Sequence, residues 1–522
     1  MLTPNLNLEK IVSVTTGLMH RGLESAALRF PDHVAVLAGD DRWTFAELDR
    51  AANAAAGHLV SLGVGPGDRV AVMTSNRPEF VVVVQATSKL GAAPVLLNSS
   101  WKAREVATAL GLTGPRCAVA DGAAVALLVD QLGAAAVLDL DAPRAASVID
   151  RTGTDGPPDA AVRETDDAVF VFSSGTTDSP KAVRHTHGSI ALATEHWCLA
   201  LGLTNDDRFQ VATPPSHILG LLNLLAAAAA GATVRLHRRF DLDEELRCIE
   251  EERMTLEMAV APIALAMANH PDLERCDLSS LRYVMWGATP VTPSVAETVT
   301  ARSGVRWLPA YGTSEVPVIT ANPVDRPDAW RLDSAGLPVG DVELRVADLD
   351  SGAVLPAGET GEIQVRSATA MAGYLPEAAT AAAFADSEWY RTGDVGYLEP
   401  EGWVHLTDRR KEMIKVSGFQ VAPAEIEAVL HGHPAVVDCA VFGVPDEQAG
   451  EVPVAAVQLE PGATVGAGDL QRLVAAELAT YKHLHRVVLV DSIPRTPSGK
   501  VLRRVLRDEW APQLPLAVSG AG

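Results

Sequence analysis

The stretch SSGTTDSPKAV, residues 173–183, follows an apolar run, DDAVFVF, at residues 166–172. The run is rich in β-branched and aromatic residues and begins with two aspartates, which predicts a buried strand. The loop that leaves this strand carries hydroxyl groups, one glycine and one ammonium group, on Ser173, Ser174, Gly175, Thr176, Thr177 and Lys181. Such groups can together surround anionic oxygens. The loop is a candidate phosphate site, with a polar surface turn as the alternative, and it lacks the G-x-x-x-x-G-K-[ST] pattern of a Walker loop.

The overall charge narrows the range of partners. The chain has 522 residues, with 43 Lys and Arg against 66 Asp and Glu, which gives a formal net charge of -23. An acidic surface repels nucleic acid and anionic lipid, so we expect neither as a partner. The five cysteines are Cys117, Cys198, Cys248, Cys276 and Cys439. Because no C-x-x-C spacing occurs, we expect neither a zinc site nor a disulfide framework, which fits a reducing cytoplasm.

Two apolar segments bear on export and membrane insertion. The N-terminal sequence MLTPNLNLEKIVSV lacks the basic start and long apolar core of a signal peptide. The longest apolar run, residues 218–234, is interrupted by Gly220, Asn223 and Gly231. It falls short of the ~20 residues that span a bilayer. We therefore predict a cytoplasmic protein in which this run forms a buried helix that leads into a strand.

Helical and strand-like segments alternate along most of the chain. The predicted helices include residues 44–62, which a threonine could cap, 79–90 and 246–253, and the predicted strands include 69–73, 93–97, 255–260 and 281–285. This alternation indicates crossover units on largely parallel sheets. The length favours more than one domain. We expect an α/β fold whose large N-terminal domain, residues 1–407, has mostly parallel sheets flanked by helices.

A dense charge cluster, TDRRKE at residues 407–412, precedes a change of pattern. Beyond it, residues 422–430 and 470–480 have helical periodicity, whereas residues 436–441, 452–459 and 487–490 are typical of strands. This predicts a small α+β domain over residues 408–522, with its boundary at Asp408 and a frayed tail from residue 511.

Five motifs occur in one order along the chain. They are SSGTTDSPK at 173–181, YGTSE at 311–315, YRTGD at 390–394, DRRKEMIKVSGFQVAPAEIE at 408–427 and PRTPSGKVLRR at 494–504. With these motifs the chain resembles the AMP-forming acyl- and aryl-CoA ligases of the adenylate-forming superfamily, and the resemblance covers almost the whole chain. In that family a carboxylate is first joined to AMP, because oxide is a poor leaving group, and the CoA thiol then expels the AMP.

The resemblance implies a nucleotide site assembled from separate motifs. The loop hydroxyls and Lys181 would surround the phosphates, and Glu315 would hold Mg²⁺ through hard carboxylate oxygens. Asp394 would accept hydrogen bonds from the ribose hydroxyls, with Arg409 at the same sugar. Tyr311 offers a flat face to adenine. The small neighbours that would complete the adenine site are Gly287, Ala288, Gly312 and Thr313.

The resemblance also implies two catalytic segments in the small domain. Lys500, in the loop PSGK, resembles the lysine that stabilises charge as the carboxylate attacks the α-phosphorus. Lys415 and Gln420 match positions that approach the adenylate, and Ser417 and Gly418 match the pantetheine tunnel.

Two further positions follow from the family. In the family the small domain turns about a hinge, here Asp408, to present first Lys500 and then the 417–418 loop, so we expect a mobile domain. His217, in PPSHILG, matches a position at the acyl pocket, although a lone histidine is more often structural.

The phosphate loop departs from the family pattern TTG-x-PKG, because Asp178 and Ala182 stand where glycines are expected. Asp178 would bring a carboxylate towards the β- and γ-phosphates, and at about 6 Å with an effective dielectric of about 20 each like charge costs about 2–3 kcal/mol. That is about a hundredfold in rate. Ala182 would add a methyl group where the chain packs closely. We therefore expect ATP-dependent adenylation to be weak or lost, with thioester formation from a preformed acyl-adenylate retained.

Three classes of function follow. The first is a CoA ligase, complete or reduced to its second half-reaction, which uses ATP or an acyl-AMP, CoA and Mg²⁺ and in the reduced case depends on a separate adenylating enzyme. The second is transfer of the acyl group to a carrier protein or an amine. The third is a non-enzymatic nucleotide sensor, which Lys500 disfavours. Small residues favour a bulky hydrophobic or aromatic acid: Gly220, Gly287, Ala288 and Gly312.

Overall fold

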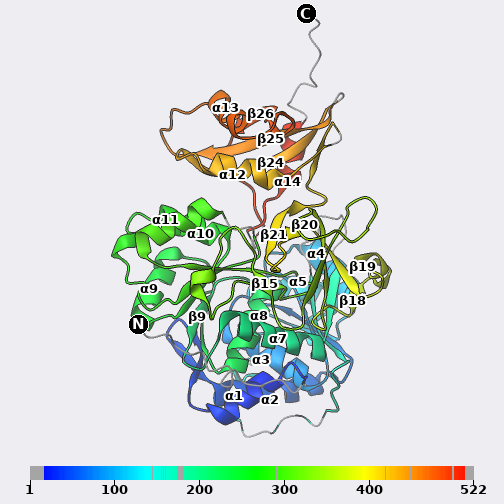
Figure 1. Cartoon of the computed structure of the whole chain (residues 1–522). Coiled ribbons are helices and arrows are strands. Elements are labelled where there is room, and N and C mark those ends of the chain that lie inside the picture. Colours follow the sequence, from blue (N-terminus) through cyan, green and yellow to red (C-terminus); the bar gives the residue numbers. More distant parts are fainter. Residues whose placement is uncertain are drawn as a thin grey trace, which may run out of the picture.

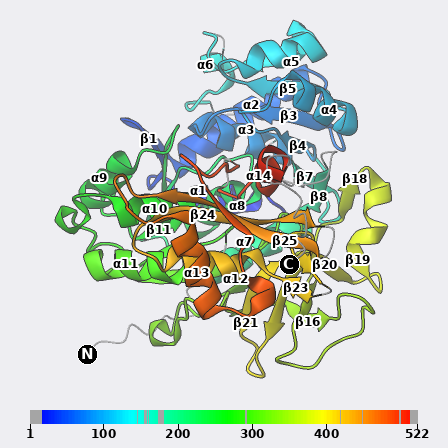
Figure 2. The ribbon, with the colours of Figure 1, turned by 90° about the horizontal axis from the view of Figure 1, so that it is seen from above.

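The computed structural model describes residues 17–143, 145–153, 156, 158, 160–172, 181–289, 292–417, 419–446, 449–496 and 499–511. They form a large N-terminal domain with a small domain above it (Figure 1). Seen from above, the sheet of the small domain lies across the middle of the large one (Figure 2). Within these residues no helix is both long and apolar enough to cross a bilayer.

Two largely parallel sheets form most of the large domain, as the alternation of segments predicts. The seven-stranded sheet has the order β18-β8-β7-β4-β3-β5-β6, in which β8 alone runs opposite to the other six strands, antiparallel to both of its neighbours, β7 and β18. Its strands are β3 (Arg69–Met73), β4 (Ala93–Leu96), β5 (Cys117–Ala120), β6 (Val137–Asp139), β7 (Asp167–Phe172), β8 (Ala182–Thr186) and β18 (Gly373–Leu375).

The nine-stranded sheet has the order β15-β14-β13-β12-β11-β9-β10-β1-β2, and its six central strands from β13 to β1 are parallel. Its strands are β1 (Val34–Ala38), β2 (Asp41–Thr44), β9 (Arg208–Val211), β10 (Thr233–Leu236), β11 (Leu256–Ala259), β12 (Tyr283–Trp286), β13 (Trp307–Tyr311), β14 (Thr320–Ala321) and β15 (Leu337–Pro338).

Helices fill three layers around the two sheets. The central layer contains α1 (Arg21–Arg29), α2 (Phe45–Ser61), α3 (Pro78–Lys89), α7 (His187–Leu201) and α8 (Ile218–Ala230), whose buried residues share one core with both sheets. The outer layers contain α4 (Ala103–Thr113) and α5 (Ala124–Leu132) on the seven-stranded sheet, and α9 (Leu242–Glu252), α10 (Ala261–Asn269) and α11 (Pro293–Ser303) on the nine-stranded sheet. A short helix, α6 (Ala145–Val148), follows β6.

Strand β12 shows why the parallel strands have continuous apolar sequences. Tyr283 and Met285 face the central core, whereas Val284 and Trp286 pack against the helices on the other face. Because side chains alternate between the two faces of a strand, a strand covered on both sides needs apolar residues at every position.

The last part of the large domain is a third, antiparallel sheet that the sequence analysis did not predict. It has the order β16-β17-β20-β19, with β21 paired to β20. Its strands are β16 (Glu343–Ala347), β17 (Gly361–Arg366), β19 (Phe384–Ala385), β20 (Trp389–Leu398) and β21 (Val404–Arg409). Asp408 therefore lies inside a strand rather than in a linker.

The small domain has the α+β composition that the sequence predicts. Its sheet has the order β23-β22-β25-β24, and β26 pairs in parallel with β25. The elements are β22 (Ile414–Val416), β23 (Phe419–Val421), α12 (Pro423–His431), β24 (Val436–Asp446), β25 (Gly450–Leu459), α13 (Ala467–Glu477), β26 (Arg486–Leu489) and α14 (Arg503–Trp510).

Local signals account for several helix boundaries. Thr44 caps α2 and forms a capping box with Glu47, as its position before an amphipathic segment predicts. The predicted helix and strand over residues 218–234 are confirmed as α8 and β10. His217 caps α8 at its start, and Gly231 ends it in a left-handed conformation (φ 78°).

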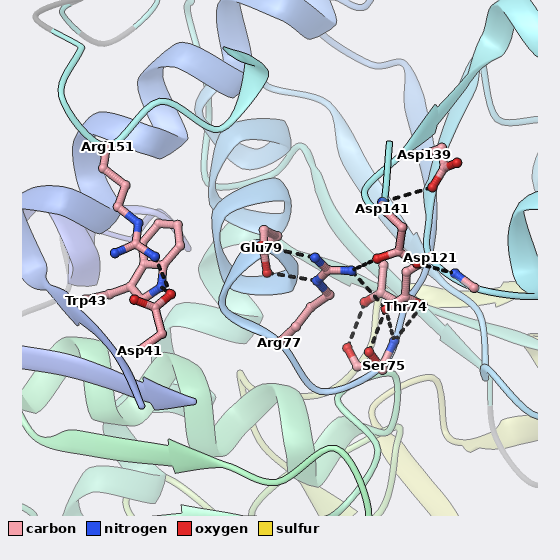
Figure 3. Close-up of polar contacts among 11 residues, drawn as sticks. Asp41, Trp43, Thr74, Ser75, Arg77, Glu79, Asp121, Asp139, Asp141 and Arg151 are labelled. Carbon is pink, nitrogen blue, oxygen red and sulfur yellow. Dashed lines mark hydrogen bonds and ion pairs between the residues drawn. The ribbon is translucent and has the colours of Figure 1, made fainter. Parts of the chain in front are cut away.

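A buried ion cluster at the carboxyl edge of the seven-stranded sheet links the loops after β3, β5 and β6 (Figure 3). Arg77 donates to Glu79 (2.8 Å), to Asp141 (2.8 Å) and to Asp121 (3.3 Å). The side chain of Arg77 is only 9% exposed, so these carboxylates replace its water shell. Ser75 adds a hydroxyl donor to Asp121 at 2.6 Å.

Asn76, the residue before Arg77, connects this cluster to the turn that carries His217. The buried amide of Asn76 donates to the carbonyl oxygens of Val211 (3.2 Å) and Thr213 (3.1 Å). The turn that starts there leads through two prolines to His217. The cluster therefore fixes a loop of one sheet against the turn that carries His217 in the other.

We expect Arg77→Met to lower the free energy of unfolding of the large domain by about 3 kcal/mol, because it leaves the partly buried carboxylates of Glu79 and Asp121 without their cation. Urea unfolding measures the change. The matched control is Arg21→Met, which removes an arginine whose side chain is 51% exposed in its pair with Glu24, and it should cost less than about 1 kcal/mol. Equal losses in the two variants would contradict a structural role for the cluster.

Candidate active site

Strand ends and strand edges of the large domain bring most of the predicted site residues together. Gly287 and Ala288 directly follow β12, and Tyr311 is the last residue of β13. Asp394 in β20 pairs directly with Arg409 in β21. Ligands bind at such carboxyl ends in open α/β sheets, because the loops there diverge and leave backbone groups free for them.

Asp394 is the centre of a polar cluster at this edge. The Tyr311 hydroxyl donates to Asp394 Oδ2 at 2.6 Å, and Arg409 Nε lies 2.9 Å from Asp394 Oδ1. Burial and the negative charge of Asp394 raise the pKa of Tyr311 well above its ordinary value, so the phenol stays neutral. A carboxylate has about four lone-pair sites, which leaves Asp394 capacity to accept from the hydroxyls of a ligand.

Glu315 is held by a residue that the sequence analysis missed. The hydroxyl of Tyr374 donates to Glu315 Oε1 at 2.7 Å, and the Lys181 ammonium lies 5.3 Å from the centre of the Tyr374 ring. Burial and then Glu315 raise the pKa of Tyr374 above its ordinary value. Tyr374 lies in β18, which pairs with β8 directly after Lys181. No motif marks Tyr374, because only the fold brings it to Glu315.

Glu315 is suited to bind Mg²⁺, but its surroundings limit how many ligands the protein itself can supply. Its carboxylate is buried and one oxygen already accepts the Tyr374 hydroxyl. Among the described residues no group of three or more His, Cys, Asp and Glu side chains could form a metal site of protein ligands alone. Mg²⁺ commonly binds one or two carboxylates together with phosphate oxygens and water, so a single glutamate suffices only beside a bound nucleotide.

Lys500 enters this site from the small domain. Burial, and then the nearby Arg409, lower its pKa to about 8, while Asp394 and Glu315 oppose that change. The preceding Gly499 contacts the large domain so closely that an added Cβ would lie 2.7 Å from Pro262 Cδ. The lysine of the small domain is thus placed among the acidic groups of the large domain.

His217 lies within the electrostatic reach of Lys500. Burial and then Lys500 lower the pKa of His217 to about 4, so the imidazole is neutral at physiological pH. Its Nδ1 accepts from the backbone N–H of Leu219 at 3.3 Å and caps α8. The structure therefore gives His217 a helix-capping contact and places it beside the same site.

Two of the small residues that favoured a bulky acid have another use in the fold. A Cβ at Gly220 would lie 2.4 Å from the carbonyl oxygen of Pro214, and a Cβ at Gly312 would lie 2.1 Å from that of Pro317. At these positions glycine permits close backbone packing rather than a wider pocket. The argument from Gly220 and Gly312 to a bulky substrate was wrong.

The second catalytic segment of the small domain is not in this site. Lys415 and Gln420 form a directly paired position of the β22–β23 hairpin, and both are exposed, as is Ser417 (φ 50°). Two of these residues bind other parts of the small domain: Lys415 N–H donates to Glu451 at 2.8 Å, and Ser417 N–H donates to the carbonyl oxygen of Ala449 at 2.6 Å. Lys500 faces the large domain while this hairpin faces outwards.

Asp408 connects the third sheet to the small domain. It accepts from the backbone N–H of Arg409 at 2.7 Å and from that of Ala424, in the first turn of α12, at 2.9 Å. Burial raises its pKa to about 6, and Arg503 opposes the change. A hinge at Asp408 stays a prediction, and the carboxylate contacts elements on both sides of it.

Several predicted residues lie outside the described residues, namely Ser173, Ser174, Gly175, Thr176, Thr177, Asp178 and Gly418. Two residues of the charge cluster at 407–412, which the sequence analysis did not assign to the site, line a cavity beside it. Arg410 and Lys411 enclose a volume of about 440 Å³ together with Thr392, Gly393 and Arg409. Partial burial and Arg409 lower the pKa of Lys411. The charge run alone could not distinguish a cavity wall from open surface.

Ala182 does not occupy a position that requires glycine, which corrects the expected cost of its methyl group. It is the fully buried first residue of β8, where it pairs with Phe172 and Leu375, and it packs in the core with Phe170. Its φ is not among the positive values recorded for described non-glycine residues. The methyl group of Ala182 fills core space.

We expect Ala182→Gly to lower the free energy of unfolding by about 1–2 kcal/mol, from the loss of a buried methyl group and of strand propensity. The ATP-dependent rate should not rise. Denaturant unfolding and an initial-rate assay measure the two quantities. A faster ATP-dependent reaction without loss of stability would show that Ala182 does crowd the loop.

Comparison with known proteins places these residues in a family. A family model described as AMP-binding enzyme matches residues 23–375, and one described as AMP-binding enzyme C-terminal domain matches residues 425–500. The chain is 35% identical over 487 residues to 4-coumarate--CoA ligase 5 of Oryza sativa subsp. japonica, which covers 90% of each chain.

Solved structures agree over almost the whole chain. The anthranilate CoA ligase AuaEII in complex with anthranoyl-AMP has a TM-score of 0.87 at 26% identity, covering 95% of this chain and 98% of that one. The amide bond synthetase McbA from Marinactinospora thermotolerans has a TM-score of 0.83 at 32% identity, covering 94% and 99%. The chain therefore belongs to the AMP-binding enzyme family and, with it, to the adenylate-forming superfamily that its motifs resemble.

Proposed function

We propose that this enzyme converts a carboxylic acid into its CoA thioester in two steps, through an acyl-adenylate. One observation carries the proposal: Lys500 of the small domain lies in the electrostatic reach of Asp394, Glu315, Arg409 and His217 of the large domain. A lysine that serves only solubility has no reason to be half-buried at a domain contact within electrostatic reach of two carboxylates.

In the first step a carboxylate oxygen of the acid attacks the α-phosphorus of ATP, and the bond to the pyrophosphate oxygen breaks. Negative charge develops on the transferred oxygens, and the Lys500 ammonium stabilises it where burial has removed water. Asp394 and Arg409 would hold the ribose, and Tyr311, with Gly287, Ala288, Gly312 and Thr313 around it, would hold adenine. Glu315 would bind Mg²⁺, which neutralises phosphate charge when present. Lys181 and the 173–177 loop would hold the phosphates.

In the second step the CoA sulfur attacks the acyl carbon, and AMP leaves with the electrons of the broken C–O bond. The residues proposed for this step, Lys415, Ser417, Gly418 and Gln420, require the small domain to turn about Asp408, because the described ones are exposed on its outer surface. One site would then serve two reactions in succession.

We propose an aromatic or otherwise bulky hydrophobic acid as the substrate. The support is the similarity to a 4-coumarate--CoA ligase and to an anthranilate CoA ligase. Gly287 and Ala288 still favour such an acid after the correction at Gly220 and Gly312, and His217 would line the pocket.

We further propose that Asp178 makes adenylation by ATP weak or removes it. The residue adds negative charge where the sequence pattern expects glycine in a phosphate loop. An acyl-adenylate has no β- or γ-phosphate, so the second step should not be affected.

A second function is transfer of the acyl group from the adenylate to an amine or a carrier protein. The observation that favours the amine is the similarity to an amide bond synthetase at 32% identity. Replacing CoA with an amine in the assay distinguishes the two acceptors.

The test compares two reactions with one aromatic acid, in the natural chain and in Asp178→Gly: acid with ATP and CoA, and chemically made acyl-adenylate with CoA. We expect acyl-CoA from the adenylate at similar rates in both chains, and an ATP-dependent rate that rises up to about a hundredfold in Asp178→Gly. An unchanged ATP-dependent rate would show that the loop aspartate is not the obstacle. A natural chain that forms product only from the adenylate would depend on another enzyme for activation. No acyl-CoA from either reaction would reject a CoA ligase.

The pH dependence of adenylation tests the role of Lys500. Since its pKa is lowered to about 8, the ammonium is present below that pH and lost above it. We expect the adenylation rate to fall about tenfold per pH unit above pH 8. Thioester formation from the adenylate should rise over the same range, because the thiolate, not the thiol, is the nucleophile and its fraction in CoA grows with pH. Lys500→Arg keeps its charge, so its slower adenylation should show no such fall.

A further inference from the structure

The loop that carries Lys500 is anchored by a group that the two-step reaction does not use. Arg495 lies five positions before the lysine and forms an antiparallel bridge with Val501. Its Nη1 donates to the carbonyl oxygen of Gly499 at 2.8 Å. The guanidinium therefore binds the carbonyl that directly precedes Lys500.

Asp438 in β24 holds the guanidinium in place. Arg495 Nη2 donates to Asp438 Oδ1 at 2.8 Å and to Oδ2 at 3.0 Å, and Nε donates to Oδ2 at 3.2 Å. The carboxylate also accepts from the backbone N–H of Cys439 at 2.8 Å. The two side chains are only 18% and 11% exposed. Because a guanidinium is planar and rigid, a forked pair with Asp438 fixes the direction in which Nη1 points.

Thr496 completes the anchor from the other side of the same peptide unit. Its hydroxyl oxygen accepts from the Lys500 N–H at 3.1 Å, and its own N–H donates to the Lys500 carbonyl at 2.8 Å. The carbonyl of Gly499 and the N–H of Lys500 belong to one planar peptide group. The Gly499 carbonyl and the Lys500 N–H are both hydrogen-bonded, so the peptide plane that leads into the Lys500 Cα is held in a single orientation.

That plane also sets how the small domain meets the large one. Gly499 has a φ of 83° and contacts Pro262 and Thr289 of the large domain. No side chain fits at position 499, so the anchored peptide group lies close against the large domain. The anchor therefore acts on the backbone at the domain contact as well as on the lysine.

We infer that Arg495, held by Asp438, is a positioning residue that aims Lys500 for adenylation and is not needed for thioester formation. This inference rests on the proposed function, in which Lys500 acts only in the first step. A shift of about 1 Å in a catalytic group can cost about a hundredfold in rate, so loss of the anchor should be visible in the first half-reaction alone.

The test measures the two half-reactions separately in the full chain, with ATP–pyrophosphate exchange for adenylation and acyl-CoA formation from supplied adenylate for the second step. We expect Arg495→Ala to lower the adenylation kcat by about 10–100-fold, with KM for ATP and acid changed less than about threefold. Thioester formation should stay within about twofold. The adenylation kcat of Asp438→Asn and of Arg495→Lys should lie between that of the natural chain and that of Arg495→Ala, because each variant keeps part of the forked pair. Arg472→Ala, which removes an exposed arginine of the same domain, should change neither.

A proportional loss in both half-reactions, or unchanged adenylation in Arg495→Ala, would overturn the inference. Lys500→Ala separates this failure from that of the proposed function. If Lys500→Ala adenylates like the natural chain, the assignment of the lysine is wrong and the inference fails with it. If only Arg495→Ala adenylates normally, the inference alone fails. Each variant is also made in the Asp178→Gly background, and absence of adenylation in both backgrounds rejects the first step itself.

Discussion

The position of one lysine constrains the rest of this molecule. The Lys500 side chain is half-buried at the contact between two domains, within electrostatic reach of Asp394 and Glu315. Removing a cation from water costs free energy unless nearby negative charge offsets it, and these two carboxylates supply that charge. A tyrosine hydroxyl binds each of them, from Tyr311 and Tyr374. The large domain thus offers a fixed acidic surface, and the small domain brings the cation to it.

Two kinds of sheet have to meet to build that surface. The parallel sheet supplies Tyr311 at the end of β13, and the antiparallel sheet supplies the directly paired Asp394 and Arg409. Neither sheet alone carries all three of Tyr311, Asp394 and Arg409. The third sheet is therefore part of the site as well as a connection to the small domain, because Asp408 directly precedes Arg409 in β21 and accepts from the backbone N–H of Ala424 in α12.

The sequence predicted the parallel sheets better than the site, for physical reasons. The predicted bounds of β3, residues 69–73, match those of the structure. A strand buried on both faces has a continuous apolar sequence, which makes it easy to predict. β16 and β20 were missed, since half-exposed strands mix polar and apolar residues. Contacts such as that of Tyr374 with Glu315 join residues 59 positions apart, and no local pattern encodes them. The prediction from Gly220 failed because a glycine can either widen a pocket or allow two backbone segments to pack closely, and the sequence does not distinguish these uses.

The two segments of the small domain that the proposed reactions use lie in different surroundings. Lys500 is half-buried at the contact with the large domain, while the Lys415–Gln420 hairpin is exposed. Phe419 on that hairpin is 55% exposed and stacks on Tyr481 with ring centres 4.5 Å apart. An exposed aromatic pair is suited to a surface that becomes covered in another arrangement. In the proposed mechanism, a turn of the small domain that covers this pair would withdraw Lys500 from Asp394 and Glu315, so adenylation and thioester formation would exclude each other by geometry, and one active site would carry out both without competition.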